Sequence, residues 1–80
     1  MNASEVNAEV SRLVENWCDR REYYGLAELL PAWISNNGLT DGWTILRDAL
    51  RHTYAFCDHL PLDERELLKT LYVKIDQALQ

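Results

Sequence analysis

Apolar residues recur at helical spacing along most of this chain, and that period constrains the fold more than any other feature. The first example follows an i, i+4, i+7, i+8, i+11 pattern and consists of Val6, Val10, Leu13, Val14 and Trp17. All of these positions fall on one face of a helix, and polar residues lie between them. Asn2 or Ser4 can cap the start of the helix by accepting a hydrogen bond from a free backbone amide. The pattern predicts a surface helix with one buried face.

A second helical pattern begins close to the end of the first. Asp19 followed by Glu22 fits a capping box, so we expect a break near Cys18 and an immediate restart. The predicted buried face of this second helix consists of Tyr23, Leu26, Ala27, Leu30, Trp33 and Ile34. A helix that continues through Pro31 loses a hydrogen bond and costs about 3 kcal/mol. We expect a kink at Leu30, because the apolar stripe keeps its phase there. The alternative is a break at which Pro31 starts a short helix.

Two further helical patterns complete the chain. Asn37 and Gly38 are expected to end the second helix, with Gly38 in the left-handed conformation, and Thr40 is the expected cap of the third. The third pattern contains Trp43, Leu46, Ala49, Leu50, Thr53, Phe56, Cys57 and Leu60. The fourth contains Leu67, Leu68, Leu71, Tyr72, Ile75, Ala78 and Leu79. Four amphipathic helices with short connections predict an all-α class, as a compact and mainly antiparallel bundle. Because the sequence has 80 residues, residues 1–80 are expected to form a single domain.

The composition argues against several classes of function. The chain carries 13 acids against 8 bases, a net charge of −5, and neither sign is gathered into a tail. An acidic surface opposes binding to nucleic acid and to anionic membranes. Cys18 and Cys57 have no framework spacing, so two reduced thiols are expected. No apolar run reaches the roughly 20 residues of a membrane span, and no secretory signal is evident. We therefore expect a cytoplasmic protein without a membrane partner.

The best candidate for chemistry is a polar arc on the third helix. Asp48 and His52 are i, i+4 neighbours, and His59 lies two turns beyond His52 on the same side. An aspartate with two histidines can hold a metal ion, or the aspartate can orient a histidine base. This arc is opposite the apolar stripe, so a solvated surface is the preferred interpretation. No phosphate-binding glycine loop is present, and no cofactor is expected.

The positions of the aromatic residues bear on whether the chain binds a partner. The sequence has three tryptophans, and helical phasing directs Trp17, Trp33 and Trp43 inward together with Tyr23. Tyr24 falls outside the stripe of the second helix, on the side of Pro31, and Gly25 can allow another backbone to approach closely. These features favour a small acidic, non-catalytic protein-interaction module. Such a module is an adaptor, an inhibitor or immunity-type protein, or a homodimer, and Tyr24, Gly25 and Pro31 would contact the partner. The alternative is a metal- or histidine-dependent enzyme using Asp48, His52 and His59.

Overall fold

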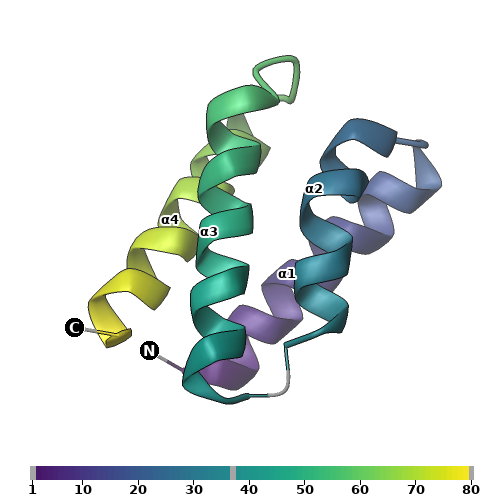
Figure 1. The fold of residues 1–80 in the computed structure, drawn as a ribbon. Coiled ribbons are helices and arrows are strands. Elements are labelled where there is room, and N and C mark those ends of the chain that lie inside the picture. The colour runs from purple at the N-terminus through teal and green to yellow at the C-terminus, as the bar shows by residue number, and fades with distance from the viewer. Residues whose placement is uncertain (1, 37, 80) are drawn as a thin grey trace.

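The fold is an all-α bundle of four helices, as predicted. The computed structural model describes residues 2–36 and 38–79, which contain α1 (Ala3–Asp19), α2 (Tyr23–Ile34), α3 (Thr40–Phe56) and α4 (Leu62–Leu79). Figure 1 shows α3 and α4 as an antiparallel hairpin, with α2 on the other side of α3 and α1 crossing obliquely behind. α3 packs against both α2 and α4, and α1 packs against α2. None of the described helices is long and apolar enough to span a membrane.

The buried face of α1 agrees with the sequence pattern. All five predicted positions are buried, and Trp17 is fully buried. The side chain of Asn2 caps the helix, because its Oδ1 accepts a hydrogen bond from the Glu5 amide at 3.2 Å. The core of the described residues consists of Val6, Val10, Leu13, Val14, Trp17, Leu29, Ala32, Trp43, Leu46, Leu50, Cys57, Leu60, Leu68, Leu71 and Ile75. Burial of these side chains from every helix is what holds so short a chain together.

The junction between α1 and α2 differs from the expected capping box. α1 continues to Asp19, and Arg21 takes a left-handed conformation with φ of 58°. The cap of α2 is Glu22, whose carboxylate accepts a hydrogen bond from the Gly25 amide at 3.2 Å. The prediction that Asp19 caps the second helix was therefore wrong. Arg21 in its left-handed conformation separates the two helices, and the side chain of Glu22 rather than that of Asp19 reaches the free amides at the start of α2.

The predicted buried face of α2 was only partly right. Leu26, Leu30 and Trp33 are partly buried and pack against the core as expected. The most buried residues are instead Gly25, Leu29 and Ala32, whereas Tyr23 and Ile34 are 66% and 71% exposed. Large apolar side chains occur nearly all round α2, so the periodicity alone did not identify the inner face. The inner face is instead the one with small residues, which lets α1 approach closely. A Cβ added at Gly25 would lie 2.7 Å from Cζ3 of Trp17.

Pro31 does not interrupt α2. The helix continues through it to Ile34, so the alternative of a break at Pro31 was wrong, and the kink remains a prediction. The hydroxyl of Ser35 donates to the Pro31 carbonyl at 2.9 Å, which helps to satisfy the end of the helix. Pro31 is exposed, so its ring lies on the surface.

The start and end of α3 differ from the sequence pattern by small shifts. Gly38 is left-handed as expected, with φ of 84°, while Asn37 lies outside the described residues. The cap is Leu39, and Thr40 is already helical, so the prediction of Thr40 as the cap was wrong by one residue. Phe56 was expected in the core and is 71% exposed. It is the last residue of α3, and its ring packs on His52 with centroids 4.4 Å apart.

Candidate protein-binding surface

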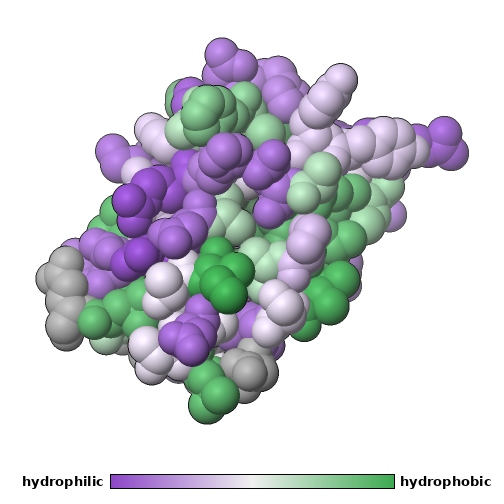
Figure 2. Space-filling model, viewed as in Figure 1, coloured by the Kyte–Doolittle hydropathy of each residue, from purple (hydrophilic) through white to green (hydrophobic). Residues whose placement is uncertain are grey.

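The outer face of α2 is apolar and exposed. It consists of Tyr24, Ala27, Pro31 and Ile34, which follow an i, i+3, i+7, i+10 spacing and are all exposed. The opposite side of the same helix is buried in the core, and Glu28 is the single charged residue of α2. Figure 2 shows hydrophobic side chains gathered along the flank that α2 forms, on the right of the view. A helix that is apolar on opposite faces is normally covered on both.

A hollow lies at the N-terminal end of this outer face. We call it the aromatic groove; it has a volume of about 350 Å³ and is lined by Tyr24, Ala27, Glu28, Phe56, Cys57 and His59. The first three residues come from α2, and the others come from the end of α3 and the loop that follows. Its lining combines the large rings of Tyr24, Phe56 and His59 with the small side chains of Ala27 and Cys57. Tyr24 is 77% exposed at its edge.

Two histidine–glutamate pairs hold the rings of the aromatic groove in place. Nε2 of His59 lies 2.9 Å from Oε1 of Glu22, and the His59 ring meets Tyr24 edge-on with centroids 6.0 Å apart. Because an ionised carboxylate only accepts hydrogen bonds, Nε2 of His59 is the donor in this contact. Nε2 of His52 lies 3.3 Å from Oε2 of Glu28, and the His52 ring packs on Phe56. One pair links α2 to α3, and the other links the cap of α2 to the loop after α3, so both sides of the groove are connected within the chain itself.

The electrostatic field in the aromatic groove is negative. Burial, and after it the charges of Glu22, Glu28 and Asp58, raise the pKa of the Cys57 thiol. Burial also acts to raise the pKa of Glu22, but hydrogen bonds from His59 and from the Gly25 amide lower it overall. The Cys57 thiol is therefore held in its neutral form, which is the unreactive form of a cysteine. Glu22 is held as a carboxylate.

The residues of the polar arc predicted for chemistry, Asp48, His52 and His59, form ion pairs or hydrogen bonds with other side chains. Asp48 forms ion pairs with Arg47 at 3.0 Å and Arg51 at 3.8 Å. His52 and His59 pair with glutamates of the α2 region, and both histidines are about half exposed. Among the described residues, no three His, Cys, Asp or Glu side chains are grouped in a way that could hold a metal ion. Each of the three residues of the enzyme alternative is therefore paired with a side chain outside that set.

The three residues predicted to contact a partner occupy different places. Tyr24 and Pro31 lie on the outer face of α2, Tyr24 at its start and Pro31 in its last turn. Gly25 is buried, and the close approach that it allows is to Trp17 of α1. Sequence reasoning missed Ala27 and Phe56, which it assigned to the core. The signal that was available is the single charge in the twelve residues of α2, since a helix with one polar face carries several.

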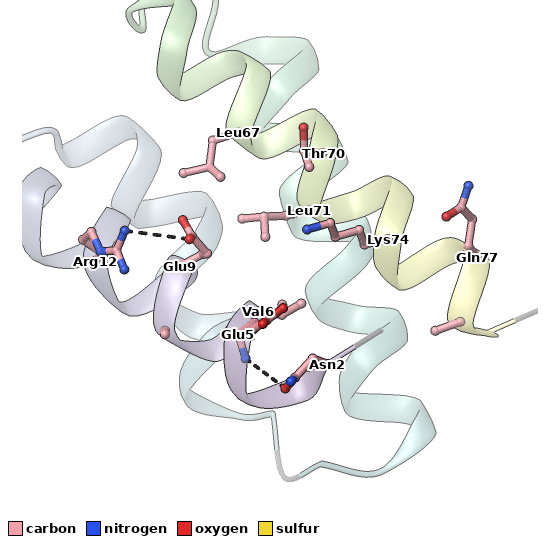
Figure 3. A pocket seen from close by; sticks show the side chains of 12 residues that line it. Asn2, Glu5, Val6, Glu9, Arg12, Leu67, Thr70, Leu71, Lys74 and Gln77 are labelled. Atoms are coloured by element: carbon pink, nitrogen blue, oxygen red, sulfur yellow. Dashed lines mark hydrogen bonds and ion pairs between the residues drawn. The ribbon is translucent and has the colours of Figure 1, made fainter.

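A second hollow lies between α1 and α4 and was not anticipated. This α1–α4 groove has a volume of about 690 Å³, and Figure 3 shows its two helices diverging on either side of it. Val6 and Leu71 are its buried apolar residues, while Glu9 and Arg12 form an ion pair at 3.7 Å along one wall. None of the large apolar side chains that the structure describes as exposed lines it. The aromatic groove is therefore the stronger candidate, although it is smaller.

The chain has no match among family models, curated proteins or solved structures. The arguments about function therefore depend on the geometry of its own residues.

Proposed function

We propose that this chain is a small, non-catalytic protein-binding module, and that the outer face of α2 with the aromatic groove is its contact surface. The observation that carries the proposal is that α2 is apolar on two opposite faces while the bundle covers only one of them. Fully burying one large apolar side chain contributes about 1.5–3 kcal/mol. A partner that covers Tyr24, Pro31 and Ile34 gains this contribution, which the isolated chain does not obtain.

The partner that best fits this surface is another protein rather than a second copy. In a two-fold dimer each copy presents the same patch to the other, so the patch that carries the charges of Glu22, Glu28 and Asp58 would face an equally acidic patch. Like charges brought together across an interface are unfavourable. The net charge of −5 adds a weaker repulsion between copies. The module is proposed to act in the cytoplasm, which is consistent with two free cysteines.

Site-specific photocross-linking in the native host tests this proposal. A benzophenone side chain would replace Tyr24 in one protein and Val73 in a matched control; Val73 is a 36% exposed residue of α4. The proposal predicts one protein that cross-links at position 24 and not at position 73. That protein, once purified, should bind Tyr24→Ala about tenfold or more weakly than wild type, because a central interface aromatic contributes about 2 kcal/mol or more. The same products at both positions, or equal affinity for Tyr24→Ala, would contradict the proposal.

Self-association is a separate outcome of the same design. Sedimentation velocity across a wide concentration range should give a monomer for wild type and for Tyr24→Ala. If wild type were a dimer and Tyr24→Ala dissociated it, the outer face of α2 would still be an interface. The partner would then be a second copy of this chain instead of another protein.

A further inference from the structure

The aromatic groove combines aromatic faces with negative charge, which is the combination that recognises an organic cation. Tyr24 and Phe56 supply rings that are largely exposed, and Glu28 supplies a carboxylate in the same lining. The negative charge of Asp58 also acts on Cys57, which lines the groove. None of the described residues that line the groove is a lysine or arginine. A cation over the face of an aromatic ring is attracted by its negative π-cloud, and a nearby carboxylate adds to this attraction.

We propose that the aromatic groove binds the guanidinium group of an arginine side chain on the partner protein, between the Tyr24 and Phe56 rings and against the Glu28 carboxylate. This inference rests on the proposed function and names the chemistry that the partner must present. The partner is therefore expected to present a basic segment to the groove, because its positive charge complements the negative charge there.

The geometry favours arginine over other cations. A guanidinium is planar, stacks on aromatic faces and presents five N–H donors, so it can contact a ring and a carboxylate at the same time. The carboxylate of Glu28 has room for a second donor, because its contact with His52 uses Oε2 and its side chain is 42% exposed. The hollow has a volume of about 350 Å³, and the small side chains of Ala27 and Cys57 in its lining leave room for a flat group.

The pKa of Cys57 supports the sign of the charge independently of the rings. Burial is the first cause of the raised pKa of Cys57, and the charges of Glu22, Glu28 and Asp58 add to it. Those charges favour a cation at the adjacent position in the hollow. Glu22 is 12% exposed and engaged with His59, so its charge contributes to the field while its oxygens hold the ring. Direct contact with a guanidinium is assigned to Glu28.

An NMR titration of the purified protein tests the inference without the natural partner. The probe is N-acetyl-arginine amide, and the matched control is N-acetyl-citrulline amide, which has nearly the same shape and no charge. The inference predicts amide shifts confined to residues 24–28 and 56–59, with a dissociation constant on the order of millimolar. Citrulline should produce shifts at least about threefold smaller at equal concentration.

Two substitutions with a control locate the binding. Glu28→Gln should weaken arginine binding by about fivefold, because one exposed charged contact is lost. Tyr24→Leu keeps an apolar side chain and removes the π face, so it should reduce the preference for arginine over citrulline. Glu5→Gln removes the same charge from the start of α1, at the opposite end of the molecule from the α3–α4 loop, and should leave binding unchanged (Figure 1).

The possible failures are distinguishable. Equal shifts from arginine and citrulline, shifts spread over the molecule, or an equal loss in Glu5→Gln and Glu28→Gln would each overturn the inference. If any of these occurs while position 24 still cross-links to one specific protein, the proposed function stands and only the arginine recognition is wrong. If position 24 also fails to cross-link, the contact surface itself is wrong.

Discussion

Replacing Gly25 by alanine tests how α1 and α2 are packed. A Cβ at this position would lie 2.7 Å from Cζ3 and 2.8 Å from Cε3 of Trp17, which is closer than nonbonded carbons approach. The indole cannot move away freely, because Trp17 is fully buried and its Nε1 donates to Oε1 of Glu64 at 2.9 Å. Gly25→Ala therefore requires either a shift of α2 or the loss of this hydrogen bond.

The expected magnitude is a balance of two opposing effects. Alanine is preferred to glycine inside a helix by about 0.5–1 kcal/mol, which stabilises the variant. Overpacking a buried site typically costs about 1–3 kcal/mol, and here the ring is held by a partner. We expect Gly25→Ala to be destabilised by roughly 1–2 kcal/mol, which lowers the melting temperature of a domain this size by about 5–15 °C.

Thermal unfolding followed by circular dichroism measures this change, and two further variants identify its cause. Gly38→Ala is the matched control, because Gly38 has φ of 84° and no described atom within 4 Å of an added Cβ, so only backbone strain acts. Trp17→Phe provides a smaller ring and should recover part of the loss in Gly25→Ala but none in Gly38→Ala. A Gly25→Ala protein that melts at or above the wild-type temperature would refute the packing of Trp17 on Gly25.

The remaining predictions concern Trp17, Glu64 and Tyr24. Trp17→Ala should cost about 3–5 kcal/mol in urea unfolding, a large share of a small domain's stability, and a wild-type midpoint would refute its place in the core. Hydrogen bonds from Arg20 and then Trp17 lower the pKa of Glu64 despite its burial. Its contribution to stability is therefore complete above the unfolded pKa near 4.5 and is lost as the pH falls below it. The stability difference between wild type and Glu64→Gln should shrink from neutral pH to about pH 3, and a constant difference would argue against it. Tyr24→Ala should change the free energy of unfolding by less than about 1 kcal/mol, because the ring is exposed, and a larger loss would place Tyr24 in the core.

The fold class followed from the sequence because it depends on periodicity, which is a local property. α1 shows this most clearly. Val6, Val10, Leu13 and Val14 are spaced by three or four residues with polar residues between them, and this spacing places them on one face of a helix. The caps were less predictable, since they depend on a single backbone conformation. Arg21 adopts a left-handed conformation that favours glycine, and the identity of the residues around it did not predict a turn at this position.

The candidate surface could not be derived from periodicity, because α2 lacks a polar face. When apolar residues lie all round a helix, the partner helix decides which side turns inward. Here the decisive contact is between Gly25 and the buried ring of Trp17, which lie on different helices, so the periodicity of neither helix relates them. The inward turn of Gly25 and Ala32 placed Ala27 on the outside, and with it the aromatic groove. The pairing of His59 with Glu22 is a similar long-range consequence.

The rotation of α2 is the central claim, since both proposals depend on which face is exposed. It is tested most directly by the thiol reactivity of Ala27→Cys and Ala32→Cys, each in a Cys18→Ser background that removes the exposed native cysteine. The structure has Ala27 exposed and Ala32 only 7% exposed, so Ala27→Cys should react rapidly in the native protein. Ala32→Cys should react at least about tenfold more slowly, because the helix must open first. Fast reaction at position 32 and protection at position 27 would show that α2 presents the opposite face and would remove the proposed binding surface.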